Sequence, residues 1–157
     1  MERPYGDYRR WAYYANFYLA KRMKIIRNKY IPFRKFDCMN ILGFLFVREE
    51  VELKDYIIRH EATHTLQQLE ILVVSAIVAL LASNIYQSWW YALIVILMPI
   101  AIYVLAWLVE LILPPYDTAY RDSPFEREAY ANQHNPEYNS QRSWFAWCGY
   151  VLKKRKK

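Results

Sequence analysis

Glycine, cysteine and histidine are scarce in this chain, which has three Gly, two Cys and three His among its 157 residues. The scarcity of glycine leaves little flexible linker. The length allows one domain of ordinary size, so any site must be built from segments that share a single core. Cys38 and Cys148 lie far apart and form no CxxC pair, which argues against a cysteine metal knuckle and a disulfide scaffold.

Positive charge is absent from the middle of the chain, although the formal net charge is +6. No Lys or Arg occurs from His60 to Tyr120, and this interval holds two apolar runs, Ile71–Ala82 and Trp89–Leu113. A bilayer core requires about 20 apolar residues, so the second run can cross it, and the first can do so if it extends beyond these bounds. We therefore expect a membrane helical hairpin, and the lipid bilayer rather than nucleic acid as the partner of the basic ends.

The distribution of Lys and Arg also predicts an orientation. Basic segments stay on the cytoplasmic side, so both termini are expected there, in an integral protein of the cytoplasmic (inner) membrane. The alternative is a soluble protein with two buried core helices. The chain disfavours it, because a domain of this size has little else with which to wrap an apolar helix of about 25 residues.

The whole chain, 1–157, is expected to form a single membrane-embedded domain of mainly α-helical fold. Composition and periodicity predict its segments. These are an interfacial helix at 8–24, a short strand or hairpin at 40–47 with a membrane-dipping helix as the alternative, a helix at 50–82 that runs into the first membrane segment, a second membrane segment at 89–113, a short helix at 124–134, and an interfacial aromatic and basic tail at 141–157.

The motif "HEATH", residues 60–64, lies on the expected helix 50–82 and uses two of the three histidines. His60 and His64 are one helical turn apart, so both imidazoles project from the same face and can bind one metal ion. Glu61 lies about 100 degrees around the helix from His60, near enough to hold a water molecule and take its proton. The motif thus predicts a metal site at the inner membrane surface.

A catalytic zinc site needs a third protein ligand, and the helix 124–134 offers three candidates. Ser123 and Glu126 form a capping box at the start of this helix, which gives Glu126 a structural role. Side chains two positions apart on a helix point in nearly opposite directions, so Glu128 is then free to face the metal. Asn132 lies one turn further on the same face and could orient a ligand. His134, near the end of the helix, is the alternative ligand.

The segments "HEATH" and "EAYAN", residues 128–132, together resemble the gluzincin metallopeptidases. In that group His-Glu-x-x-His is completed by a Glu in a Glu-x-x-Ala-Asp or Glu-x-x-Ala-Asn helix. The membrane-bound members, similar to the CAAX-processing and HtpX-like proteases and the BlaR-type sensor proteases, keep the site at the cytoplasmic membrane face. Asn132 departs from the Asp of these membrane-bound groups and matches the Asn of the soluble ImmA/IrrE-like proteins. The resemblance covers these two motifs and the hairpin between them.

This resemblance implies a membrane-embedded zinc-dependent metallopeptidase that hydrolyses a peptide bond at the cytoplasmic membrane face. Zn²⁺ is then bound by His60, His64 and Glu128. Glu61 is the general base, which takes a proton from the attacking water and passes it to the leaving amine. The substrate is a peptide or a membrane protein, and the stretch 40–47 could present a strand edge to it.

Some neighbouring side chains are candidates for contacts with the substrate. Gln68 shares the His64 face and could line the cleft. Alternatively, Gln68 is an interfacial polar residue without a special role. An oxyanion partner is also expected, and its candidates are Tyr120, Arg127, Tyr130 and His134.

Other metal chemistries and functions compete with this interpretation. Membrane di-iron enzymes require many histidines, and ferritin-like sites require a second Glu-x-x-His pair, so both fit poorly. A zinc-dependent lipid amide or ester hydrolase would use the same machinery as a peptidase. A non-enzymatic, metal-stabilised membrane scaffold or adaptor is the third alternative.

Overall fold

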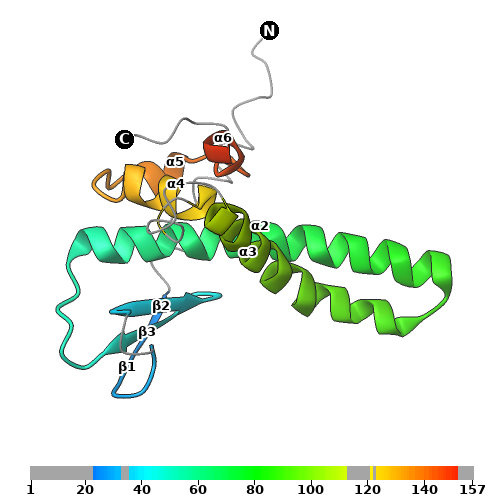
Figure 1. The fold of residues 1–157 in the computed structure, drawn as a ribbon, viewed down its shortest axis with the longest axis horizontal. Coiled ribbons are helices and arrows are strands. Elements are labelled where there is room, and N and C mark those ends of the chain that lie inside the picture. Colours follow the sequence, from blue (N-terminus) through cyan, green and yellow to red (C-terminus); the bar gives the residue numbers. More distant parts are fainter. Residues whose placement is uncertain (1–22, 33–35, 113–120, 122, 152–157) are drawn as a thin grey trace, which may run out of the picture. The chain divides into compact units, whose positions relative to one another are not determined.

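A computed structural model of the chain describes residues 23–32, 36–112, 121 and 123–151. The described fold is mainly helical, with few strands (Figure 1). Its contacts divide the chain into two compact units, one of residues 1–66 and 128–144 and the other of residues 67–127 and 145–157. The interfacial helix expected at 8–24 lies outside the described residues, except at its end, where Lys24 opens a strand instead.

The first unit contains a three-stranded sheet. Its strands are β1 (Lys24–Asn28), β2 (Cys38–Ile41) and β3 (Phe44–Arg48), in the order β1-β3-β2. β1 runs parallel to β3, and β2 runs antiparallel to it. The strand or hairpin expected at 40–47 is therefore a hairpin, with Leu42 and Gly43 as its two turn residues. β1 was not expected from the sequence.

One face of the sheet is buried. Leu45 and Val47 alternate along β3 and are fully buried, which is the pattern of a strand with one face toward a core. Asn40 of β2 is also buried, and its side-chain amide donates to the Glu61 carbonyl and to Thr65 Oγ1, 2.8 Å away. The sheet is thereby fastened to the helix that carries the HEATH motif.

This helix, α2 (Asp55–Tyr86), is a single element of 32 residues. The expected helix at 50–82 is correct in type, but it begins five residues later and continues four residues further. No Gly or Pro interrupts the sequence between its ends, so nothing stops it before the turn at Gln87, which has a φ of 50°. The motif residues lie in its second and third turns.

The second unit contains the other long apolar helix. The segment expected at 89–113 forms a 3₁₀ turn, η1 (Trp89–Leu93), followed by α3 (Ile94–Ile112). Both α2 and the helical stretch Trp89–Ala106 are long and apolar enough to cross a membrane. Only 22% and 0%, respectively, of their most apolar windows are buried, whereas a core helix of a soluble protein is mostly buried.

Three short helices complete the described chain: α4 (Pro124–Asn132), α5 (Tyr138–Gln141) and α6 (Cys148–Val151). The N-cap of α4 is as expected, since the Glu126 N–H donates to Ser123 Oγ at 3.3 Å. Phe125 is buried in the second unit, where its ring stacks on Tyr103 with a centroid distance of 4.4 Å and packs against Trp147 at 4.7 Å. The interfacial tail expected at 141–157 includes α6, and its last six residues lie outside the described chain.

Candidate metal centre

The two motif histidines converge on one point. His60 and His64 are buried, at 8% exposure each, and their Nε2 atoms lie 3.1 Å apart. The rings meet edge to face, with a centroid distance of 4.8 Å and an interplanar angle of 81°. Two nitrogens that bind one tetrahedral zinc ion at about 2.0–2.1 Å are themselves about 3.3 Å apart. The observed separation fits two ligands of a single ion.

Glu61 is buried beside this pair. Its backbone carbonyl accepts hydrogen bonds from Asn40 and from the Thr65 hydroxyl, the latter at 3.3 Å, so both β2 and the next helical turn fix its position. Burial, and after it the negative charges of Glu61 and Asp37, raise the pKa of the nearby Cys38 thiol to about 11, against an opposing effect of Arg27. Glu61 is thus close enough to Cys38 to affect its ionisation.

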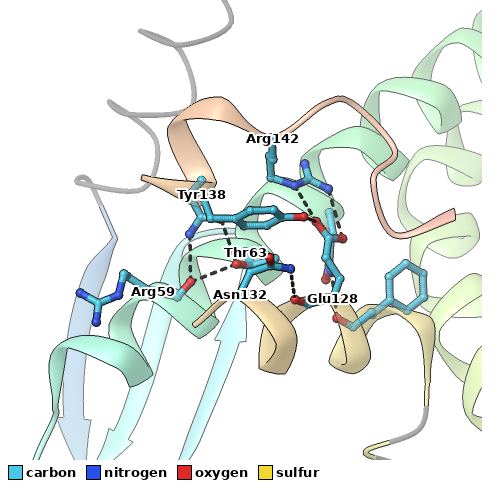
Figure 2. Close-up of polar contacts among 9 residues, drawn as sticks. Arg59, Thr63, Glu128, Asn132, Tyr138 and Arg142 are labelled. Atoms are coloured by element: carbon cyan, nitrogen blue, oxygen red, sulfur yellow. Dashed lines mark hydrogen bonds and ion pairs between the residues drawn. The ribbon is translucent and has the colours of Figure 1, made fainter. Parts of the chain in front are cut away.

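Glu128, the expected third ligand, is engaged by other residues. It is fully buried, and its Oε1 accepts hydrogen bonds from Tyr138 Oη and Arg142 Nε, each at 2.8 Å. Arg142 Nη2 lies 3.3 Å from the second oxygen, which makes the ion pair bidentate. Figure 2 shows both side chains directed at the Glu128 carboxylate. Asn132, expected to orient a ligand, instead donates to the Glu128 backbone carbonyl at 2.7 Å.

The other face of α4 carries Glu126 and Tyr130, which are one helical turn apart. The Tyr130 ring lies edge to face against the His60 ring, with a centroid distance of 4.6 Å. Within the described part of the chain, His60, His64 and Glu126 are a buried group of side chains that could hold a metal ion. In the sequence, the capping box at the start of α4 predicts a structural role for Glu126 instead.

A second polar cluster braces the histidine turn of α2. The Asn139 amide donates to the Arg59 carbonyl at 2.9 Å, and the Thr63 hydroxyl donates to Asn139 Oδ1 at 2.9 Å. Arg59 Nε donates to the Gln133 carbonyl at 2.8 Å. The sequence did not single out Tyr138, Asn139 or Arg142, because no local pattern marks a partner that lies 10 to 80 positions away.

The remaining candidates from the sequence lie in different surroundings. Tyr130 is 39% exposed, and His134 is exposed with its ring 5.4 Å from that of Tyr56. Gln68 is only partly buried, whereas its neighbour Gln67 is fully buried and donates to the Phe125 carbonyl at 3.0 Å. Arg127 is partly buried, and Tyr120 lies outside the described residues.

Comparison with known proteins identifies no relative. No family model, no curated protein and no solved structure matches the chain. The arrangement of these side chains is therefore the evidence from which a function can be inferred.

Proposed function

We propose that this protein is a membrane-embedded, zinc-dependent hydrolase, and specifically a metallopeptidase of the gluzincin type. The observation that carries the proposal is the convergence of the His60 and His64 Nε2 atoms, 3.1 Å apart, on the helix that also carries Glu61. Both rings are buried, and they are thereby removed from bulk water.

The donor set fits zinc. Catalytic zinc sites use three protein ligands and keep one position open, and two His with one Glu is an established set. We assign the third ligand to Glu126, because Glu128 is neutralised by Arg142 and because Glu126 shares the face of α4 that packs on His60 through Tyr130. When bound, zinc would polarise a substrate carbonyl and make a water molecule acidic enough to ionise near neutral pH.

Glu61 acts in this proposal as the general base. It takes a proton from the attacking water and later donates that proton to the leaving amine. Asn40 and Thr65 hold the backbone of the helical turn from which its side chain projects. Tyr130 lies against His60 but remains partly exposed, and its hydroxyl is a candidate donor to the oxygen that becomes negative in the transition state.

The same proposal places the second half of α2 and the α3 helix in a bilayer. Both are apolar, and their side chains are largely exposed, which in water would be a costly surface. Lys and Arg flank this part of the chain and do not occur within it, so the basic ends and the metal centre are assigned to the cytoplasmic side of the inner membrane.

A peptide is the favoured substrate because a sheet edge lies beside the centre. β2 is an edge strand, and its Asn40 bonds directly to the backbone of Glu61. An extended peptide can add to such an edge through its main-chain hydrogen bonds. A lipid amide or ester would make no use of this edge.

The test is the zinc content of the protein purified in detergent, measured by mass spectrometry. We expect near-stoichiometric zinc in the wild type, and loss of zinc in His60→Ala and in Glu126→Gln. Glu128→Gln and the matched control Glu70→Gln, which alters another buried carboxylate on α2, should retain it. A folded wild type that takes up no zinc would overturn the proposal, and loss in Glu128→Gln with retention in Glu126→Gln would move the third ligand to Glu128.

Catalysis requires a second measurement. Glu61→Gln should bind zinc as the wild type does, yet show no hydrolysis of peptides or of lipid amides and esters, because it lacks the base. Hydrolysis of lipids but not of peptides would replace the peptidase by a lipid hydrolase. Zinc binding without any hydrolysis in the wild type would favour a scaffold.

A further inference from the structure

The tip of the β2–β3 hairpin exposes three large apolar side chains close together in the sequence. Ile41, Leu42 and Phe44 are 49%, 45% and 47% exposed, respectively. Ile41 and Phe44 are paired in the register of the hairpin, and Leu42 lies in the turn between them. An exposed apolar residue alone is ordinary, but three that meet at the end of a hairpin form a compact apolar point.

The first residue of the hairpin turn, Leu42, has a backbone conformation that leucine rarely adopts. Leu42 has a φ of 49° and Gly43 a φ of 86°, so both turn residues adopt the left-handed conformation. Two-residue turns of this kind favour Asn, Asp or Gly at the first position, because a large side chain is strained there. Leucine at this position therefore costs stability, and its side chain is 45% exposed.

The hairpin tip is held firmly on α2. The Gly43 N–H donates to Asn40 Oδ1 at 3.1 Å, and Asn40 in turn bonds to the helix. A Cβ placed on Gly43 would lie 3.5 Å from the Thr65 methyl, which shows how close the tip comes to this turn of the helix. The apolar run of α2 begins at Ile71, six residues beyond Thr65, or about 9 Å along the helix axis. The lipid headgroup layer extends about 6 Å beyond the hydrocarbon core, so the tip is within side-chain reach of it.

Charge around the tip favours a lipid surface. Lys24 is exposed, is aligned with Phe44 in the sheet, and donates its backbone N–H to the Gly43 carbonyl at 2.8 Å. The stretches 23–32 and 38–48 contain no Asp or Glu, and the sequence that precedes Lys24 is basic and aromatic. Cations beside apolar side chains match anionic headgroups above acyl chains.

We propose that the hairpin tip Ile41–Phe44 is a lipid anchor, which inserts into the headgroup region of the membrane and fixes the depth of the HEATH turn of α2. The partner is the anionic lipid surface itself. The anchor requires the bilayer but no metal, so it can fail while zinc binding holds, and the reverse is equally possible.

The test measures the depth of residue 42 in lipid nanodiscs. Leu42→Cys and the control Tyr30→Cys are made in a Cys148→Ser background and labelled with a nitroxide. Tyr30 is 85% exposed and lies on the same unit, away from the tip. In bilayers containing phosphatidylglycerol we expect the label at 42 to be accessible to oxygen and shielded from a water-soluble nickel relaxant, and the label at 30 to show the opposite. Equal access of the nickel reagent to both positions would overturn the proposal.

A second variant separates anchoring from turn geometry. Leu42→Asn should raise the Tm of the protein in detergent by a few degrees, because Asn tolerates the left-handed conformation. In nanodiscs, a label placed by Phe44→Cys should then become more accessible to the nickel reagent than it is with Leu42 present. Unchanged accessibility would mean that Leu42 does not hold the tip in lipid, and protection that appears only after a peptide is added would assign the tip to substrate binding.

Discussion

The two halves of helix α2 are built in opposite ways. From His60 to Gln67 every side chain is buried, and all but Ala62 and Leu66 are polar or charged. Nearer the other end most of the exposed residues are apolar, and Leu80 and Ile85 are each 71% exposed. A helix of a soluble protein buries its apolar side and exposes its polar side. Here both halves invert that rule, and each inversion has its own cause.

In the first half, several of the buried polar groups have partners from other segments. Asn40, Asn139 and Gln133 bond to residues of this half through side-chain or backbone groups. Buried polar groups that are hydrogen-bonded cost little, and the geometry of such bonds fixes the position of each group. The second half has few partners of this kind, and a surrounding of lipid would explain its exposed side chains.

The largest expected effect on stability comes from removing the buried ion pair between Arg142 and Glu128, which holds α4 in place. Arg142→Ala should lower the free energy of unfolding by about 3–5 kcal/mol, because it leaves the Glu128 carboxylate buried without its counter-charge. Arg48→Ala, which breaks the exposed pair with Glu50, should have a much smaller effect, because water and salt screen exposed charges. Denaturant unfolding in detergent measures both. The double variant Arg142→Leu with Glu128→Leu should recover most of the loss, and a failure to recover would mean that the charges themselves are required.

A charge in the second half of α2 tests whether lipid surrounds it. Leu80→Lys should disfavour membrane insertion by about 2.5–3.5 kcal/mol if this half spans a bilayer. In water the same change at a 71% exposed position would be nearly neutral. The measurement is the inserted fraction in a glycosylation-based membrane insertion assay, with Tyr30→Lys as the control. Equal insertion of the wild type and Leu80→Lys would remove the physical basis of the comparison between the halves.

Two buried hydroxyls, one in each half, provide a matched pair with a smaller effect. Thr63 and Ser75 both donate to the carbonyl four residues earlier, at 3.1 and 2.7 Å, but only Thr63 also bonds to Asn139. Thr63→Val should therefore cost about 1–2 kcal/mol, because it leaves the Asn139 oxygen unsatisfied, whereas Ser75→Ala should cost less than about 0.5 kcal/mol. Chemical unfolding of the two variants side by side decides this. Equal losses of stability would show that the hydrogen bond between Thr63 and Asn139 does not stabilise the first half of α2.

Local patterns in the sequence predicted the elements better than their partners. The HEATH helix, the hairpin near 40–47 and the Ser123 cap all follow from nearby residues, and the structure contains each of them. The surroundings of Glu126 and Glu128 depend instead on distant residues, since Arg142, 14 positions from Glu128, engages the Glu128 carboxylate. Capping chemistry alone cannot distinguish two acidic residues on one short helix, because it does not locate the opposite charge.

Strand β1 is an element of the fold that the local sequence does not predict. Its sequence, KIIRN, is too short and too basic to indicate a strand by alternation, and its pairing is parallel to a strand about 20 positions later. Parallel pairing requires a crossover that leaves no turn signal in the sequence. The burial of Gln67 could not be predicted for a related reason, since its partner is the Phe125 carbonyl in another helix.

The smallest effect is on the reactivity of the two thiols. The thiol of Cys38, at the start of β2, has a pKa raised to about 11, so it is protonated near neutral pH. At pH 8 only about one molecule in a thousand carries the thiolate. Its alkylation by iodoacetamide should rise about tenfold per pH unit up to about pH 11, while the exposed Cys148 is modified first. Glu61→Gln should lower the pKa of Cys38 and speed its alkylation, because a negative charge that stabilises the protonated thiol is removed. Mass spectrometry of the alkylated peptides measures both rates. If Glu61→Gln leaves the rate at Cys38 unchanged, burial and Asp37 raise this pKa without a contribution from Glu61.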